Sequence, residues 1–127
     1  MKNYEKWHLV KSKIESLEKS ALFREREIWW CSLGENIGFE QDGKNEQFER
    51  PVLVLKKFSH DVFFGIPMTS TRKEHPLYFP YTLNETSGSF ILSQARILST
   101  KRLQRKITSL GRGIFAEIKT QYIKIIS

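Results

Sequence analysis

The first stretch of the chain repeats apolar residues at a helical spacing. Trp7, Val10, Ile14, Leu17 and Ala21 follow one another at steps of three or four residues, which places them on one face of a helix. Asn3 is a suitable N-cap before the first of them. We therefore predict an amphipathic helix over residues 4–22, whose apolar stripe packs on its own domain or on a partner protomer.

From residue 27 onward the pattern changes to short segments rich in β-formers, separated by polar turns. We predict strands over 28–33, 51–55, 62–68, 77–83, 90–98 and 106–110, with a short helical turn from Ser99 to Arg105 and a helix over 111–126. Pro80 makes the fourth strand an edge strand. The intervening loops are 34–50, 56–61, 69–76 and 84–88.

This element order predicts an α+β, mostly β fold: a small SH3-like β-barrel of five to seven strands with a C-terminal helix and an extra N-terminal amphipathic helix. We divide the chain into an N-terminal extension, 1–25, and a barrel domain, 26–127. Trp29 and Trp30 point to opposite faces of the first strand, so one is expected in the core and the other at a dimer seam.

Composition narrows the class of protein. Hydrophobic residues make up 39% of the 127 residues and charged residues 28%, which is ordinary for a soluble globular domain. No apolar run reaches the roughly 20 residues that cross a bilayer, and no apolar signal core precedes the fold. The single cysteine, Cys31, cannot form an internal disulfide. We therefore expect a cytoplasmic protein without a membrane partner.

The net charge of +7 is concentrated in the last quarter of the chain. Residues 96–127 contain eight lysines and arginines against one acid, Glu117, whereas residues 1–95 are balanced. A surface of one sign attracts polyanions, of which nucleic acid is the commonest, although a solubilising surface has the same composition.

Two kinds of site are excluded by spacing. The histidines, His8, His60 and His75, are far apart and form no ligand pair with each other or with cysteine, so we expect no metal site and no cofactor. No Gly-rich phosphate loop is present. The remaining candidates are Arg50, at the entry to an apolar strand, and the hydroxyls of Thr69 and Ser70 at the end of another. An arginine there suits a phosphate group because its charge is fixed and its donors form a fork.

Taken together, these segments resemble the MazF/PemK family of toxins. The matching segments are, in order, Arg26-Glu27-Ile28-Trp29-Trp30; Gly38-Phe39-Glu40-Gln41 with Arg50-Pro51-Val52-Leu53-Val54; Pro67-Met68-Thr69-Ser70; and Leu92-Ser93-Gln94-Ala95-Arg96. The resemblance covers the chain from about residue 26 to its end and leaves the N-terminal helix outside.

The resemblance implies the toxin of a type II toxin–antitoxin system, a metal-independent endoribonuclease (mRNA interferase). Such a toxin is a homodimer that cuts single-stranded RNA and is silenced by its cognate antitoxin. The 2′-hydroxyl attacks the phosphorus and leaves a 2′,3′-cyclic phosphate and a 5′-hydroxyl. The family's catalytic arginine falls on Arg50 and its threonine on Thr69. Supporting or RNA-binding roles are expected for Glu40, Gln41, Glu49, Ser70, Arg72, His75, Ser93, Gln94 and Arg96. Phe39, Phe48 and Tyr78 are candidates to stack on bases.

Two departures from the family pattern keep an alternative open. Ser93 stands where many relatives carry an acid, and several residues are inserted between Gln41 and Arg50. Proton transfer then involves Glu40, Glu49 or His75 in its place. Alternatively, the acid of the relatives contributes to the choice of RNA sequence and not to proton transfer. The alternative is a non-catalytic barrel toxin of the gyrase-poison type, or a degenerate module that binds RNA or protein. The N-terminal helix, in a third hypothesis, restrains activity from the groove that an antitoxin would occupy.

Overall fold

The computed structural model describes residues 23–33 and 49–127. The predicted N-terminal helix and residues 34–48 of the long loop, including Phe39, Glu40, Gln41 and Phe48, lie outside the described residues. The elements are β1 (Glu27–Ser32), β2 (Glu49–Lys57), β3 (Val62–Thr69), β4 (Tyr78–Leu83), β5 (Thr86–Ile91), η1 (Leu92–Gln94), β6 (Arg96–Ser99), η2 (Thr100–Arg102), β7 (Leu103–Ser109) and α2 (Arg112–Ile126).

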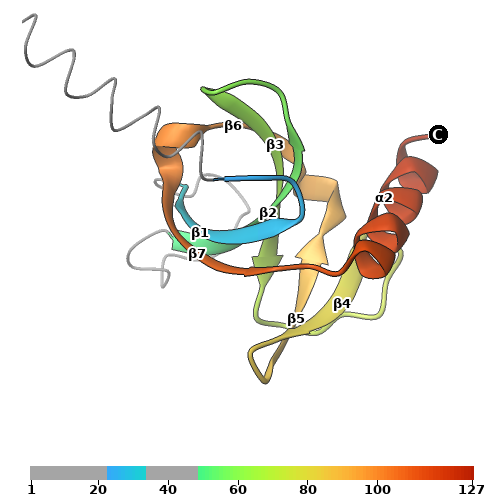
Figure 1. Ribbon diagram of the computed structural model, residues 1–127. Helices are drawn as coiled ribbons and strands as arrows, with labels where there is room; N and C mark the ends of the chain where they lie inside the picture. Colours follow the sequence, from blue (N-terminus) through green and yellow to red (C-terminus); the bar gives the residue numbers. More distant parts are fainter. Residues whose placement is uncertain (1–22, 34–48) are drawn as a thin grey trace, which may run out of the picture.

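The seven strands form one antiparallel sheet in the order β4-β5-β3-β2-β1-β7, and β6 pairs with β3 beside this path. The sheet curls on itself, and α2 lies beside the end that carries β4 and β5 (Figure 1). The mostly β fold with a C-terminal helix is therefore confirmed, and β4 is the edge strand that Pro80 predicted.

Alternation along the strands divides the core into two clusters. Ile28, Leu53 and Ile66 face α2 and pack with its buried Phe115 and Ile118. The residues that alternate with them on β1, β2 and β3 belong to the second cluster, which contains Trp29, Cys31, Val52, Val54 and Phe63 together with Phe23, Leu98 and Leu103. Residues 52–55 of β2 are buried on both faces of the strand, so this part of β2 is rigid. It therefore fixes the backbone of Arg50, which lies two residues before it.

The prediction of one continuous strand over residues 90–98 was wrong, because a 3-10 turn, η1, separates this stretch into the end of β5 and the beginning of β6. β5 pairs with the end of β3, where Phe90 lies opposite Met68, and β6 pairs with its beginning, where Ile97 lies opposite Phe64. The three residues of η1 shift the register by three positions between these pairings. Ser99 caps η2 by accepting a hydrogen bond from the Lys101 backbone N–H at 3.1 Å, so the predicted helical turn forms, but it ends at Arg102 and not at Arg105, because Leu103–Ser109 pairs with β1 as strand β7.

Several boundaries also differ from the prediction, among them those of the β4–β5 turn and of β2. The turn predicted over 84–88 consists of Asn84 and Glu85 alone, whose φ angles of 48° and 69° suit a tight hairpin. Pro51 lies inside β2 and not at its start. It is tolerated because the pairing of β2 with β3 begins only at Val52, so Pro51 pairs on one side, with Trp30.

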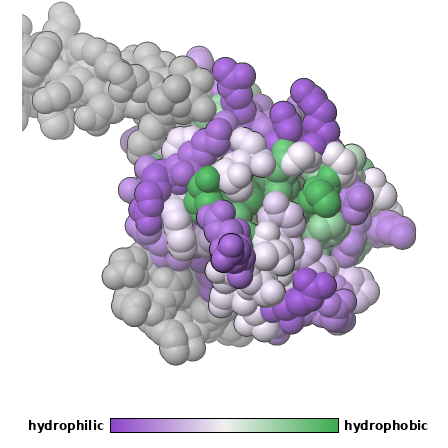
Figure 2. Space-filling model, turned by 60° about the horizontal axis from the view of Figure 1, so that its bottom comes forward, coloured by the Kyte–Doolittle hydropathy of each residue, from purple (hydrophilic) through white to green (hydrophobic). Residues whose placement is uncertain are grey.

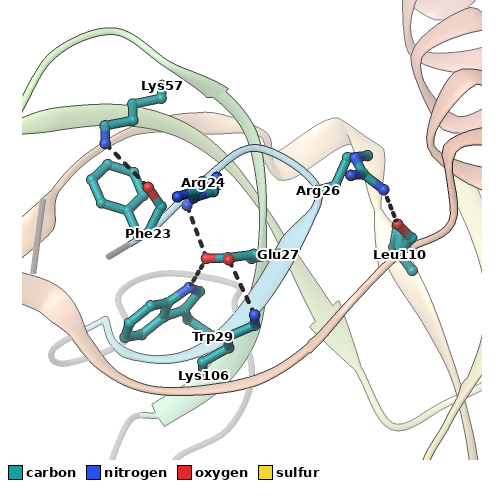
Figure 3. Close-up of polar contacts among 8 residues, drawn as sticks. All are labelled: Phe23, Arg24, Arg26, Glu27, Trp29, Lys57, Lys106 and Leu110. Atoms are coloured by element: carbon teal, nitrogen blue, oxygen red, sulfur yellow. Dashed lines mark hydrogen bonds and ion pairs between the residues drawn. The ribbon is translucent and has the colours of Figure 1, made fainter. Parts of the chain in front are cut away.

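A buried carboxylate joins the two strands at one end of the sheet path (Figure 3). Glu27 is 5% exposed, and it accepts hydrogen bonds from the Arg24 backbone N–H at 2.8 Å and from Trp29 Nε1 at 2.9 Å. Lys106 Nζ of β7 lies 3.1 Å from its other oxygen. Arg26, at φ 80°, donates to the Leu110 carbonyl at 2.8 Å and so ties β1 to the segment that leads into α2.

Candidate active site

Arg50 lies where β2 leaves its pairing with β3. Its backbone pairs with Cys31 of β1, and its Nη1 donates to the Met68 carbonyl of β3 at 3.0 Å. Continuing the register of β2 and β3 by two residues from Val52 and Pro67 brings Arg50 opposite Thr69. A fixed cation and a hydroxyl, both half-buried, therefore stand at the ends of adjacent strands.

Thr69 is the last residue of β3, and its position depends on β5. Its Oγ1 accepts a hydrogen bond from the Thr71 backbone N–H at 3.4 Å, and its backbone pairs with Ser89. A Cβ built on the neighbouring Gly88 would lie 2.4 Å from the Thr69 carbonyl oxygen. Gly88 was not among the predicted site residues, because its importance comes from a close approach between two strands that are distant in sequence.

A pocket of about 260 Å³ opens beside Thr69. Its apolar lining comes from Trp30, Pro51, Met68, Leu83 and Ile107, and its polar lining from Thr69, Ser70, Asn84, Thr86 and Ser87. Gly88 completes the wall. We call this cavity the Trp30 pocket. Figure 2 views the molecule from the side that carries the β4–β5 hairpin, where small hydrophobic areas are framed by hydrophilic side chains.

Trp30, half-buried, is in contact with a cation. The Arg105 guanidinium lies over its ring, 5.3 Å from the centroid, and Glu49 Oε1 is 4.0 Å from Arg105 Nη1. Trp29, at 7% exposure, is the core tryptophan that the alternation predicted. Trp30 lines the pocket, which the sequence did not indicate.

The segment between β3 and β4 carries the predicted Arg72 and His75, both exposed. Arg72 pairs with Glu74 at 3.2 Å, and His75 Nδ1 accepts a hydrogen bond from the Leu77 backbone N–H at 3.1 Å. The segment is held at Ser89, whose Oγ accepts from the Lys73 backbone N–H at 2.9 Å.

The helix α2 holds the same segment at its far end. Gln121 Nε2 donates to the Pro76 carbonyl at 2.8 Å and to the Tyr78 carbonyl at 3.1 Å. Tyr78, a predicted stacking residue, is half-buried, with Lys73 Nζ 5.3 Å from its ring centroid and the His75 ring edge-on to it.

The fourth predicted motif lies elsewhere along β3. Ser93 and Gln94 belong to η1, and Arg96 pairs with Gly65, four residues before Thr69. At about 3.3 Å per residue this is roughly 13 Å along the strand. The structure thus brings Arg50, Thr69, Ser70 and Glu49 to one end of the sheet and places Ser93, Gln94 and Arg96 nearer its middle.

Within residues 23–33 and 49–127, no three His, Cys, Asp or Glu side chains are close enough to share a metal ion. In the same ranges no helix is long and apolar enough to cross a membrane.

Comparisons with known proteins identify the family and the fold. A model of the PemK-like, MazF-like toxins of type II toxin–antitoxin systems matches residues 24–126. No curated protein sequence matches the chain. Among solved structures, MazF from Deinococcus radiodurans superposes with a TM-score of 0.64 at 22% identity, covering 82% of this chain and 96% of that one.

Two mycobacterial structures share the fold as well. An endoribonuclease in complex with its cognate antitoxin has a TM-score of 0.62 at 13% identity, covering 80% of this chain and 92% of that one. The Mycobacterium tuberculosis toxin MazF-mt6 has a TM-score of 0.57 at 18% identity, covering 78% and 97%. Because the family model spans most of the chain, the protein belongs to the PemK-like, MazF-like toxins of type II toxin–antitoxin systems.

Proposed function

We propose that the chain is a cytoplasmic, metal-independent endoribonuclease that cleaves single-stranded RNA, and that its sheet is the SH3-like barrel of the family. The observation that carries the proposal is the contact of Arg50 with the Met68 carbonyl, which holds a guanidinium beside Thr69 at the end of two paired strands. The complex of a mycobacterial endoribonuclease of the same fold with its antitoxin gives further support.

In the proposed reaction the ribose 2′-oxygen forms a bond to phosphorus, and the bond from phosphorus to the 5′-oxygen breaks. The 2′-hydroxyl loses one proton and the 5′-oxygen gains one, so the products are a 2′,3′-cyclic phosphate and a 5′-hydroxyl. The phosphoryl oxygens gain negative charge in the transition state, which Arg50 stabilises because it is already in place. Thr69 donates a hydrogen bond from its hydroxyl to the same phosphate. Arg50 stays protonated and is not the base.

The proposal is tested by substituting Arg50 and Thr69 and measuring RNA cleavage in EDTA, with the new ends mapped chemically. Arg50→Ala should lower the cleavage rate by about two to three orders of magnitude. Thr69→Val removes the hydroxyl at nearly constant shape and should also lower it. Arg112→Ala, at an exposed position on α2, is the matched control and should cleave normally.

Full activity in a folded Arg50→Ala variant would overturn the assigned site. Intact RNA of varied sequence after incubation with the wild-type protein would overturn the ribonuclease itself. That second result would favour the non-catalytic alternative, a gyrase-poison-like toxin or a degenerate binding module.

The proposed partners are a cognate antitoxin and a second copy of the chain. A band of apolar side chains extends from the β2–β3 turn over β3 and β6 to α2, and consists of Phe58, Phe64, Ile97 and Tyr122, with Ile126 one helical turn beyond Tyr122. Phe58, Ile97 and Ile126 are 54%, 62% and 62% exposed. The Phe64 ring lies 6.4 Å from that of Phe58 and 5.8 Å from that of Tyr122. An exposed apolar surface of this kind marks an interface.

Ile97→Lys places a charge in the middle of this band, so the dimer should dissociate to a monomer in analytical ultracentrifugation. Leu77→Lys, which adds the same charge at a partly exposed apolar position outside the band, is the control. A dimer that persists in Ile97→Lys would place the interface on another surface.

A further inference from the structure

We infer that the Trp30 pocket binds one unstacked nucleobase of the substrate, with the Trp30 indole as the surface on which the base lies. This inference rests on the proposed ribonuclease function, because it assigns a neighbour of the phosphate held by Arg50 and Thr69. It adds a residue that no catalytic role requires, since Trp30 belongs to the face of the sheet opposite Arg50.

The size of the pocket limits the kind of ligand that it can hold. Sites for drug-sized molecules are about 300–1,000 Å³, so the 260 Å³ beside Thr69 suits a single flat ring system. A helix or strand of a partner protein is too large to enter such a space. A nucleobase of single-stranded RNA is free to leave the stack and enter it.

The lining has the chemistry of a base site. Trp30, Pro51 and Met68 offer apolar surface, and an aromatic face binds any base by stacking. Ser70, Asn84 and Ser87 supply hydroxyl and amide groups that can hydrogen-bond to the edges of a base. The pocket therefore combines an unspecific stacking surface with polar groups that can prefer one base.

Arg105 adds a charge beside the indole. Its guanidinium, 5.3 Å from the centre of the Trp30 ring, is mostly exposed and loosely paired with Glu49 at 4.0 Å. An exposed pair of this length holds its partners weakly, so a phosphate of the RNA can replace the carboxylate. Trp30 and Arg105 thus bind the base and the backbone of the same nucleotide or its neighbour.

The location of the pocket fixes which nucleotide is bound. Thr69 and Ser70 line it, and Thr69 is the proposed phosphate-binding hydroxyl. Because Trp30 and Arg50 lie on opposite faces of the sheet, the RNA has to pass around the ends of β2 and β3, and the base in the pocket belongs to a nucleotide near the cleaved bond. We expect this position to contribute to the sequence preference of cleavage.

The test measures binding of a single-stranded oligonucleotide made uncleavable by a 2′-deoxy ribose at the cleaved position. Trp30→Leu keeps apolar volume but removes the ring, and should weaken binding about tenfold, the order expected for one lost stacking contact. Trp30→Phe keeps a ring and should restore most of the affinity. Ile123→Ala, at an exposed apolar residue of α2 outside both this pocket and the apolar band, is the control and should bind as the wild type does.

A scan with a single abasic nucleotide identifies the contact directly. One abasic position should weaken binding to the wild-type protein and have no further effect on Trp30→Leu. Ser87→Phe fills the pocket from an exposed position and should reproduce that loss without altering the core. With cleavable RNA, Trp30→Leu should raise KM and change kcat little.

Equal binding by the wild type and both pocket variants, or an abasic effect that Trp30→Leu does not remove, would overturn the inference. If Arg50-dependent cleavage persists in that case, the ribonuclease proposal stands and only the base site falls. A wild-type protein that neither binds nor cuts RNA would refute both.

Discussion

Gly88→Ala adds one methyl group where two strands approach most closely. The new Cβ would lie 2.4 Å from the Thr69 carbonyl oxygen, and real Cβ contacts essentially never fall below 3.0 Å. The obstacle is backbone, which cannot rotate away as a side chain can. β5 and the end of β3 must therefore separate by roughly 0.6 Å before the contact becomes acceptable.

Such a shift moves Thr69 relative to Arg50, which is held from the other side by β1 and β2. A misplacement of about 1 Å can cost about a hundredfold in rate, so we expect RNA cleavage to slow by about tenfold to a hundredfold. The free energy of unfolding should fall by about 1–3 kcal/mol, the usual cost of overpacking.

Gly113→Ala is the matched control, because a Cβ there meets nothing within 4 Å and the residue lies in α2. It should leave cleavage unchanged and raise the free energy of unfolding by about 0.5–1 kcal/mol. RNA cleavage by both variants is measured at urea concentrations well below the midpoints of their unfolding, which are determined by urea titration. Wild-type cleavage rates in Gly88→Ala would refute the reasoning that β5 positions Thr69.

Two further substitutions test the supports of the site. Glu27→Gln keeps an acceptor for Trp29 but removes the charge that pairs with Lys106, so the free energy of unfolding measured in urea should fall by about 1–3 kcal/mol. Glu117→Gln, at an exposed position, should change it by less than about 0.5 kcal/mol. Equal effects of the two substitutions would show that the buried carboxylate stabilises the fold no more than an exposed one. Gln121→Ala removes both hydrogen bonds to the segment before β4, so amide hydrogen exchange there should accelerate while exchange in β1 stays slow. Unchanged exchange would mean that other contacts hold the segment.

The strands and the C-terminal helix could be predicted because their hydrophobic periodicity agrees with the burial observed. Ile114, Ile118, Tyr122 and Ile125, which the helical spacing places on one face of α2, all pack toward the core. The division of residues 90–98 by η1 was missed because it depends on two pairings with β3 in different registers. Local pattern contains no information about such a shift.

Among the candidate site residues, those on strands are easiest to place from sequence. Arg50 and Thr69 meet because β2 and β3 are neighbours in the chain and pair as a hairpin. Gly88 and Trp30 contribute through strand contacts that no motif encodes, and both were missed as site residues. The buried role of Glu27 was missed as well, since a single acid before an apolar run is usually a surface residue.

Several long-range hydrogen bonds of arginine and glutamine share a type of acceptor. Arg26, Arg50, Arg102 and Gln121 donate to main-chain carbonyls, those of Leu110, Met68, Ser32, and Pro76 with Tyr78. Every amino acid has such a carbonyl, so each bond constrains the identity of one residue and leaves its partner free to change. A framework of this kind tolerates extensive sequence drift, which fits a fold shared with structures at only 13–22% identity.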